Sequence, residues 1–546
     1  MKLNIFKSIL PAAVLALGLA IVNTSCLKDL EVENINPKQT STSNEEALLN
    51  KIYASFVLTG EQGPDGNGDI AGIDEGRSEF YRMSWELNEF TTDEAHWEWF
   101  TDAGIPDLIH NTYGADNPRT QGLYYRLFFT ITLCNNYLDN FEATGDEERA
   151  KRRAEVRFIR ALNYYYVMDL YGNAAFVQHV STDPGVRYTR PQYFKFIEDE
   201  LLAIDADLAA PGTNKYGRVD KVAAWLLLSR LYLNAEVYTG TAKWQEAKNY
   251  ADKVIKNGYY HLMETDATNP VTNEHYTPYQ MLFLADNDKN GAQYEAIFPV
   301  LCDGLLTQSH GSMHFLVLSC YSKPSDNDMD IAIPSGTDCS WGKCTRVRGK
   351  LIDTFFGTKT VPATSSLTTL TTLAQDDRAL FYTNGGYSRY IVDESDQKQG
   401  YSCAKFRNVR SDGAATSSLA KVDTDLPLLR IAEAYLTFAE AETRLNGAND
   451  VAKEKIDALR DRAHALKKLS YSLDDIRDEW SREFWFEGRR RMDLVRFGCF
   501  GGQSNYTWEW MGNAANGAQF STDRNIFAIP TNDLSNNPNL KQNEGY

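Results

Sequence analysis

The chain has 546 residues, with 74 acidic and 56 basic side chains and a formal net charge of −18. This balance argues against binding to nucleic acid or to an anionic membrane surface, because both require a positive field. Aromatic residues make up 12% of the chain, with 30 Tyr and 10 Trp, so there is material for a large core and for stacking surfaces.

The first 25 residues are typical of an export signal. A charged start precedes an apolar run from Ile9 to Val22, which is shorter than the roughly 20 residues of a membrane-spanning helix. Two small residues then precede Cys26, as in bacterial lipoproteins, so we expect a signal peptide at 1–25 and a lipid on Cys26. Ordinary signal cleavage beside an unmodified Cys26 is the alternative. The polar residues 26–44 would then tether the protein to a membrane that it contacts only through this lipid.

Cysteine usage excludes a disulfide framework as the main source of stability. Eight cysteines include Cys26 and leave seven, so at least one thiol is unpaired within the chain. Cys339 and Cys344 are close enough in sequence to close a small loop, and the sequence leaves that question open.

From residue 45 to about 258, apolar residues recur at spacings of three and four, which predicts amphipathic helices. The clearest unit is a helical pair, which turns at Thr239-Gly240 and has Ala where its helices cross, as in a tetratricopeptide repeat. Single repeats cannot bury their faces, so several must stack. The helices are expected at 45–58, 121–141, 147–171 and within 219–258, with a second pair at 428–445 and 451–464 and a last helix at 473–497.

Helical periodicity fades between residues 259 and 424, where polar residues and Gly punctuate short apolar runs. Loops on a rigid scaffold are where binding sites concentrate. We therefore predict a mainly α fold over 45–546, a tetratricopeptide-like helical-repeat scaffold with a loop-rich ligand-binding subdomain. Its helical parts are expected at about 45–258 and 425–500, the subdomain at about 259–424, and C-terminal loops at 501–546.

Three segments carry a family resemblance. Residues 428–441 read LLRIAEAYLTFAEA, residues 482–498 read REFWFEGRRRMDLVRFG, and the chain closes with Ile529-Pro530 and the residues QNEGY. Together with the lipoprotein start, these segments resemble the SusD-like (RagB/SusD) family of outer-membrane nutrient-binding lipoproteins. In the Arg-rich segment, helical spacing places Glu483 and Glu487 near Arg490 or Arg491, which indicates a structural ion-pair lattice more than a ligand site.

Residues 74–106 are similar in order and spacing to the starch-binding SusD branch, beginning with Asp74-Glu75-Gly76 and continuing to Ile105-Pro106. The resemblance implies a lipid-anchored protein on the cell surface that captures starch-type α-glucan oligosaccharides, including maltooligosaccharides, without cleaving them. It also implies a partner, a SusC-like TonB-dependent barrel that imports the captured glycan. A binding protein of the same family for a different polysaccharide remains an alternative.

The candidate glycan-binding residues are aromatic and polar. Sugar rings stack their C–H patches on Trp or Tyr faces, and their hydroxyls pair with Arg, Asn or Asp. In an extended segment Trp97 and Trp99 would face the same way, about 7 Å apart, among the acidic residues Asp93, Glu94, Glu98 and Asp102; buried packing is the alternative. By resemblance, the starch-binding arc and its arginine match Trp99, Trp341, Arg82 and Phe315, with Tyr81 and Asp102 completing the set.

Two members of this set depart from the family pattern. Phe315 stands where a Tyr is expected, which keeps stacking but removes a hydroxyl. Asp102 stands where an amide is expected, which keeps the acceptor and removes the donor.

A possible calcium site lies at Asp286, Asp288 and Asn290, where oxygen ligands on alternate residues precede Gly291. Its fourth ligand would be Glu295, which comes earlier than the twelfth position that calcium loops use. An Asx-rich turn without an ion is the alternative. No other cofactor is expected.

Two other classes of function remain open. A glycoside hydrolase needs two carboxylates about 5–10 Å apart, and no spacing in the sequence identifies such a pair. A protein-interaction scaffold is common among helical repeats. The pair His310 and His314 is a weak metal-ligand candidate, because no third ligand has zinc spacing.

Overall fold

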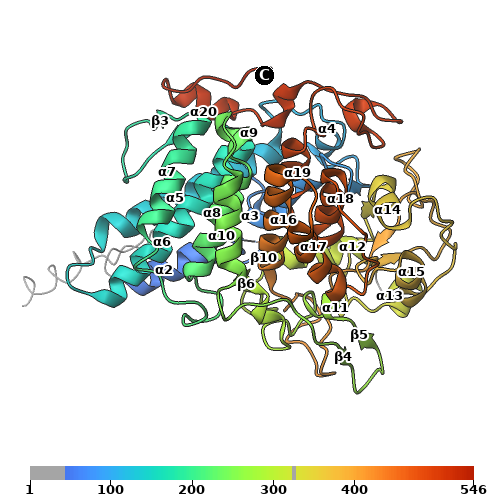
Figure 1. The fold of residues 1–546 in the computed structure, drawn as a ribbon. Coiled ribbons are helices and arrows are strands. Elements are labelled where there is room, and N and C mark those ends of the chain that lie inside the picture. Colours follow the sequence, from blue (N-terminus) through green and yellow to red (C-terminus); the bar gives the residue numbers. More distant parts are fainter. Residues whose placement is uncertain (1–43, 65, 323–327) are drawn as a thin grey trace, which may run out of the picture. The chain divides into compact units, whose positions relative to one another are not determined.

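The computed structural model describes residues 44–64, 66–322 and 328–546, and residues 49–546 form one folded unit that is mainly helical (Figure 1). Cys26 and the rest of the expected signal peptide lie outside the described residues. None of the described helices is long and apolar enough to cross a membrane.

The α-helices follow in chain order. The first half of the chain contains α2 (Glu45–Ala54), α3 (Phe80–Glu89), α4 (Ile105–Ile109), α5 (Pro118–Asn140), α6 (Glu147–Tyr166), α7 (Arg190–Ala203), α8 (Lys221–Leu233), α9 (Ala235–Thr239) and α10 (Trp244–Ile255). The second half contains α11 (Pro278–Met281), α12 (Ser312–Cys320), α13 (Asp328–Ala332), α14 (Gly349–Phe356), α15 (Leu367–Ala374), α16 (Ala432–Asn446), α17 (Asp450–Arg462), α18 (Leu473–Phe484), α19 (Arg490–Arg496) and α20 (Thr531–Asn536).

Short 3₁₀ turns and five two-stranded sheets complete the secondary structure of the described residues. The 3₁₀ turns are η1 (Glu75–Arg77), η3 (Ala292–Tyr294), η4 (Met511–Asn513) and η5 (Thr522–Asn525), and η2 (Val167–Tyr171) is a π-helical turn. The antiparallel pairs are β1 (Ala95–Trp97) with β7 (Thr345–Val347), β6 (Ala296–Val300) with β10 (Leu426–Arg430), β2 (Ala175–Phe176) with β3 (Val186–Arg187), β4 (Ala267–Thr268) with β5 (His275–Tyr276), and β8 (Phe381–Tyr382) with β9 (Ser402–Cys403).

The predicted helical pairs are confirmed. Helices α8 and α10 pack on each other, and α10 also packs on α16, which in turn packs on α17 (Figure 1). The small residues Ala247 and Ala251 are buried on the face of α10, which allows the neighbouring helices to approach closely. The mainly α, repeat-type scaffold expected from periodicity is therefore present.

Three predicted helix boundaries are wrong. Leu428–Arg430 belong to strand β10, because pairing with β6 and a bond from Ile431 N–H to the Glu295 carbonyl delay the start of α16. The helix expected at 45–58 already ends at Ala54. The end of the helix expected at 147–171 is confirmed instead, because its last turn is the π-helical η2 and Gly172 ends it with a φ of 69°. The helix expected at 473–497 breaks between α18 and α19, where Phe486 has a φ of 61°.

The buried ion-pair lattice expected around the Arg-rich segment is present. The expected pairing of Glu483 and Glu487 with Arg490 or Arg491 is wrong, because tertiary contacts supply arginines that are distant in sequence. Glu483 is buried among Arg378, Arg430 and Arg462, and Glu487 pairs with Arg430 at 2.8 Å. Arg430 also reaches Glu295 at 3.0 Å. These pairs join α17, α18, β10 and η3 in the interior of the scaffold.

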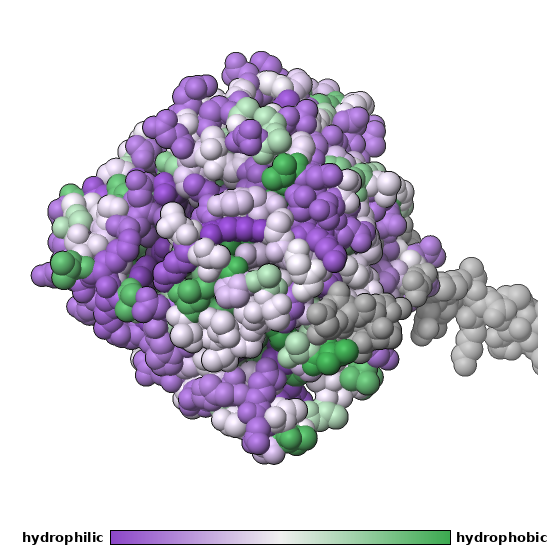
Figure 2. All heavy atoms as spheres, turned by 90° about the vertical axis from the view of Figure 1, so that its right-hand side faces the viewer, coloured by the Kyte–Doolittle hydropathy of each residue, from purple (hydrophilic) through white to green (hydrophobic). Residues whose placement is uncertain are grey.

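The region 259–424 carries the short elements α11 to α15 and β4 to β9 among its loops. The face that includes α13, α14 and α15 is largely hydrophilic, with hydrophobic residues scattered over it (Figure 2).

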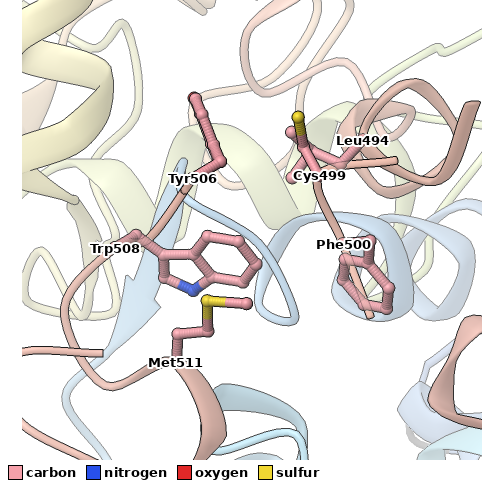
Figure 3. Close-up of a cluster of buried hydrophobic side chains, with 6 residues drawn as sticks. All are labelled: Leu494, Cys499, Phe500, Tyr506, Trp508 and Met511. Carbon is pink, nitrogen blue, oxygen red and sulfur yellow. The ribbon is translucent and has the colours of Figure 1, made fainter. Parts of the chain in front are cut away.

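The chain after α19 packs its own small core. Figure 3 shows the side chains of Tyr506, Trp508 and Met511 beside those of Leu494, Cys499 and Phe500, and all six are buried. Apolar burial of this kind explains why the expected C-terminal loops remain ordered without long helices.

Candidate functional site

The candidate glycan-binding residues come together from four segments of the chain. We call Trp97, Trp99, Phe315, Trp341 and Arg82 together the platform. Strand β1 ends at Trp97, and Glu98 N–H continues the β1–β7 ladder by donating to the Cys344 carbonyl at 2.9 Å. The loop before β7 carries Trp341, whose backbone N–H donates to the Leu318 carbonyl of α12 at 2.7 Å. Helix α12 supplies Phe315, and helix α3 supplies Arg82.

The aromatic rings form a continuous series. The ring of Trp99 meets that of Trp97 edge-on, with centroids 5.6 Å apart. Trp97 lies nearly parallel to Phe315 at 6.0 Å, and Phe315 lies 5.9 Å from Trp341. Trp99 and Trp341 are therefore joined through two intervening rings, although they are distant in sequence.

Arg82 lies within this series. Its guanidinium carbon is 5.1 Å from the ring centroids of both Phe315 and Trp341, a cation–π geometry. The Nε–H donates to Glu86 at 2.9 Å, and Nη1 donates to the His310 carbonyl at 3.4 Å. A side chain at Gly76 would come within 2.9 Å of Nη1, so glycine leaves room for the guanidinium group.

Burial separates the predicted residues into two groups. Trp99 is 40% exposed, and Arg82, Asp102 and Trp341 are partly exposed. Trp97, Phe315 and Tyr81 are at most 1% exposed. The prediction that these three contact a ligand directly is therefore wrong for this conformation, since none of them offers a face to solvent.

The expected shared face of Trp97 and Trp99 fails for a local reason. The strand ends at Trp97, and the chain then turns, with Phe100 N–H donating to the Glu98 carbonyl and Asp102 N–H to the Trp99 carbonyl. Trp97 points inward, and its indole N–H donates to Asp102 at 3.2 Å. Trp97 therefore supports the turn that presents Trp99.

The acidic residues near the platform have basic partners. Arg490 pairs with Asp93 at 2.8 Å and lies 3.6 Å from Glu94, which also accepts from the Ser481 hydroxyl. Both carboxylates therefore belong to the buried lattice. Glu98 pairs with Arg346. Burial raises the pKa of Glu98 to about 7, although the Arg346 guanidinium opposes the rise.

Two histidines border Trp341. The ring centroids of His310 and His314 lie 6.3 and 6.4 Å from that of Trp341. Burial, with a smaller contribution from Lys421, lowers the pKa of His314 to about 3, so this ring is neutral at pH 7. No group of three or more His, Cys, Asp or Glu side chains in the described parts of the chain has the arrangement of a metal site.

In the expected calcium site, Asn290 donates to Asp286 at 3.4 Å, and the remaining contacts of the four residues are to other parts of the chain or to solvent. Asp286 is buried and accepts from Ser411 N–H at 3.1 Å and from its hydroxyl at 2.7 Å, while Asp288 is exposed. Asn290 donates to the Met281 carbonyl at 3.0 Å. Glu295 is held by Arg430 and Arg462. These contacts agree with the alternative of an Asx-rich turn, and calcium binding at this segment stays a prediction.

Cysteine thiols take no part in the platform. Cys344 is buried and forms no disulfide, so the small loop that a bond between Cys339 and Cys344 would close is not formed in the described residues. Sequence reasoning missed Glu86 and Arg119, which hold the platform arginine and the Asp102 turn. The spacing of Arg82 and Glu86, four residues apart on a helix, is the signal that could have identified the first of them.

The fold and the site define a helical-repeat protein that carries a partly exposed aromatic platform on loops beside the repeats. The family model described as "SusD family" matches residues 354–546, and the one described as "Starch-binding associating with outer membrane" matches residues 26–233. The chain is 38% identical to the starch-binding protein SusD of Bacteroides thetaiotaomicron, and the match covers all of both chains. The chain therefore belongs to the SusD family.

More distant relatives agree with this placement. A SusD-like protein of Bacteroides ovatus is 23% identical over 71% of this chain and 68% of its own. A SusD-like carbohydrate-binding protein of Bacteroides fragilis has the same fold, with a TM-score of 0.66 at 18% identity over 92% of this chain and 99% of its own. A SusD superfamily protein of Parabacteroides distasonis has a TM-score of 0.65 at 20% identity, over 93% of this chain and all of its own.

Proposed function

We propose that this chain is a non-catalytic glycan-binding protein of the cell surface that captures starch-type α-glucan oligosaccharides. The observation that carries the proposal is the meeting of exposed Trp99, partly exposed Trp341 and Arg82 in one aromatic series. The full-length relative that is named for starch binding supports the same ligand class.

The geometry suits a curved sugar chain. Trp99 and Trp341 offer separate stacking surfaces at the two ends of the series, so successive glucose rings of a bent α-glucan can rest on both. Arg82 supplies N–H donors between them, and Asp102 supplies a carboxylate acceptor beside Trp99. Phe315 adds only apolar support, because it has no hydroxyl group.

The absence of cleavage is part of the proposal. Glycoside hydrolysis needs one carboxyl group to act as an acid and a second to act as a nucleophile or base. At the platform, Glu86 and Glu98 are paired with arginines, and Asp102 lies 3.9 Å from Arg119 while it accepts from Trp97. Carboxylates engaged in this way are suited to positioning and accepting hydrogen bonds, which supports binding over catalysis.

We further propose that a lipid on Cys26 anchors the protein at the outer membrane, facing outward. There it would pass the glycan to a SusC-like TonB-dependent transporter. Support comes from the family model that matches residues 26–233, whose description names association with the outer membrane. The departure at Asp102, which is partly exposed beside Trp99 and has no amide donor, favours one second candidate, a different polysaccharide bound by the same platform.

Isothermal titration with maltoheptaose, followed by chromatography of the incubated sugar, tests the proposal. We expect saturable binding and recovery of intact maltoheptaose. Shortened products would indicate a glycoside hydrolase, and the absence of both binding and cleavage would favour a protein-interaction scaffold. Binding of another polysaccharide alone would favour the second candidate.

A further inference from the structure

The buried carboxylate of Glu86 connects the platform to a second arginine. Glu86 is fully buried on α3, and its Oε1 accepts from Arg82 Nε–H at 2.9 Å. The same carboxylate accepts two bonds from Arg119 Nη1, at 2.9 and 3.1 Å. One buried negative charge therefore serves two guanidinium groups, of which Arg119 is buried and Arg82 stays partly in contact with solvent.

The bond from Glu86 fixes the direction of the Arg82 guanidinium. A guanidinium group is planar and rigid, so the bond from Nε–H to Glu86 fixes the plane in which both Nη groups lie. Within the described residues, Nη2 of Arg82 has no hydrogen-bond partner, and the side chain remains 12% exposed. Glu86 thereby leaves N–H donors of Arg82 available beside the Trp341 ring.

Arg119 extends the same support to the other end of the platform. Its Nε–H donates to the Ala103 carbonyl at 3.0 Å, and its Nη2 lies 3.9 Å from the Asp102 carboxylate. This is the turn that follows Trp99 and carries the acceptor for the Trp97 indole. Glu86 is thus linked to both ends of the aromatic series through two different arginines.

We infer that Glu86 is a positioning residue for glycan binding, which acts through Arg82 and, by way of Arg119, through the Asp102 turn. This inference rests on the proposed function, because it concerns the affinity of the same platform. Glu86 itself does not touch the ligand, since its side chain is fully buried.

A double-mutant cycle tests the inference. Affinity for maltoheptaose is measured by isothermal titration for the parent, E86Q, R82A and the E86Q/R82A double variant. We expect E86Q to bind about tenfold more weakly than the parent. The double variant should bind about as well as R82A alone, or at most about threefold more weakly, because the main route from Glu86 to the ligand is then already lost.

A matched control separates positioning from general destabilisation. Glu433 is also a buried carboxylate shared by two arginines, with Arg230 at 2.6 Å and Arg489 at 3.3 Å, and it lies in the helical-repeat lattice. We expect E433Q to lower the melting temperature and to keep the parent affinity for maltoheptaose.

Three results would overturn the inference: parent affinity in E86Q, a full additional tenfold loss when E86Q is added to R82A, or an equal loss of affinity in E433Q. If E86Q does not fold, E86D replaces it in the same cycle, because it keeps the charge and only shortens the reach to the two arginines. A parent protein that binds no maltoheptaose would contradict the proposed function, and the inference with it.

Discussion

At the residue scale, the exposed indole of Trp99 rests edge-on against the buried indole of Trp97. A sugar that stacks on Trp99 therefore meets a ring that is already fixed in place. Fixing a binding group before the ligand arrives lowers the entropy lost on binding. Trp341 is held in a similar way by its backbone bond to α12 and by the Phe315 ring.

Replacing the exposed tryptophans should lower the affinity for glycan, whereas replacing the buried one should lower the folding stability. We expect W99A and W341A each to weaken maltoheptaose binding about tenfold to a hundredfold, by analogy with the loss of stacking on other aromatic platforms. Their folding should be little changed. W97A should instead cost about 3–5 kcal/mol of folding free energy, because it opens a cavity in the core.

Titration calorimetry gives these affinities and urea unfolding gives the stabilities. The matched control is W225A, which removes a half-buried tryptophan on α8 outside the platform and should bind like the parent. Parent-like affinity in both W99A and W341A would mean that the binding site lies elsewhere.

At the element scale, periodicity predicts the helices of the repeat and fails where tertiary contacts decide the backbone. Helices α10 and α17 each bury one face, which leaves the 3.6-residue signature that the sequence displays. Strand β10 has no such signature and exists because β6 lies beside it. The break at Phe486 likewise depends on distant residues, since its carbonyl accepts from Trp85 and its N–H donates to Glu94.

Tertiary contacts also limit what the sequence predicts about the platform. Resemblance to a family identifies Arg82, Trp99 and Trp341 as candidates, but not which rings are buried. The inward direction of Trp97 depends on where β1 ends and on packing against Phe315, and neither can be read from the spacing of two tryptophans.

The lattice around α18 should make stability depend on pH in the acid range. Burial alone would raise the pKa of Glu479, but Arg378, Arg460 and Arg482 outweigh it and lower the pKa to about 2. In the unfolded chain the pKa is about 4.3, so the folded state binds fewer protons between these values. The contribution, up to about 3 kcal/mol, is present above pH 4.3 and is lost as the pH falls toward 2.

Urea unfolding between pH 5.5 and 2.5 measures this dependence. We expect the free energy of unfolding of the parent to fall more steeply with acid than that of E479Q, which has no proton to gain at this site. E454Q, at an exposed glutamate on α17, should behave like the parent. Parallel curves for the parent and E479Q would contradict the assignment.

At the scale of the whole molecule, the proposed lipid anchor and the folded binding body lie in different parts of the chain. The anchor would lie on Cys26, whereas the first described helix begins at Glu45, so the two can be separated by mutation. The negative net charge of the protein opposes adsorption to anionic lipid. An acyl chain would therefore supply the membrane affinity that the folded body lacks.

Replacing the anchor should therefore change location and leave binding intact. We expect C26S to move from the membrane fraction to the soluble fraction in the expressing cells, while keeping the parent affinity for maltoheptaose. Fractionation followed by titration of the purified variant gives both quantities. Membrane association that persists in C26S would rule out the lipid as the main anchor.

We propose that the platform recognises curved α-linked glucose chains. Separate titrations of the parent protein with maltoheptaose and with cellohexaose test this proposal. Both sugars carry the same glucose rings, but the first is curved and the second is straight. We expect saturable binding of maltoheptaose and an affinity for cellohexaose at least about tenfold lower, because the proposed site requires a chain that curves to reach both Trp99 and Trp341. Equal affinity for the two sugars, or tighter binding of cellohexaose, would contradict it.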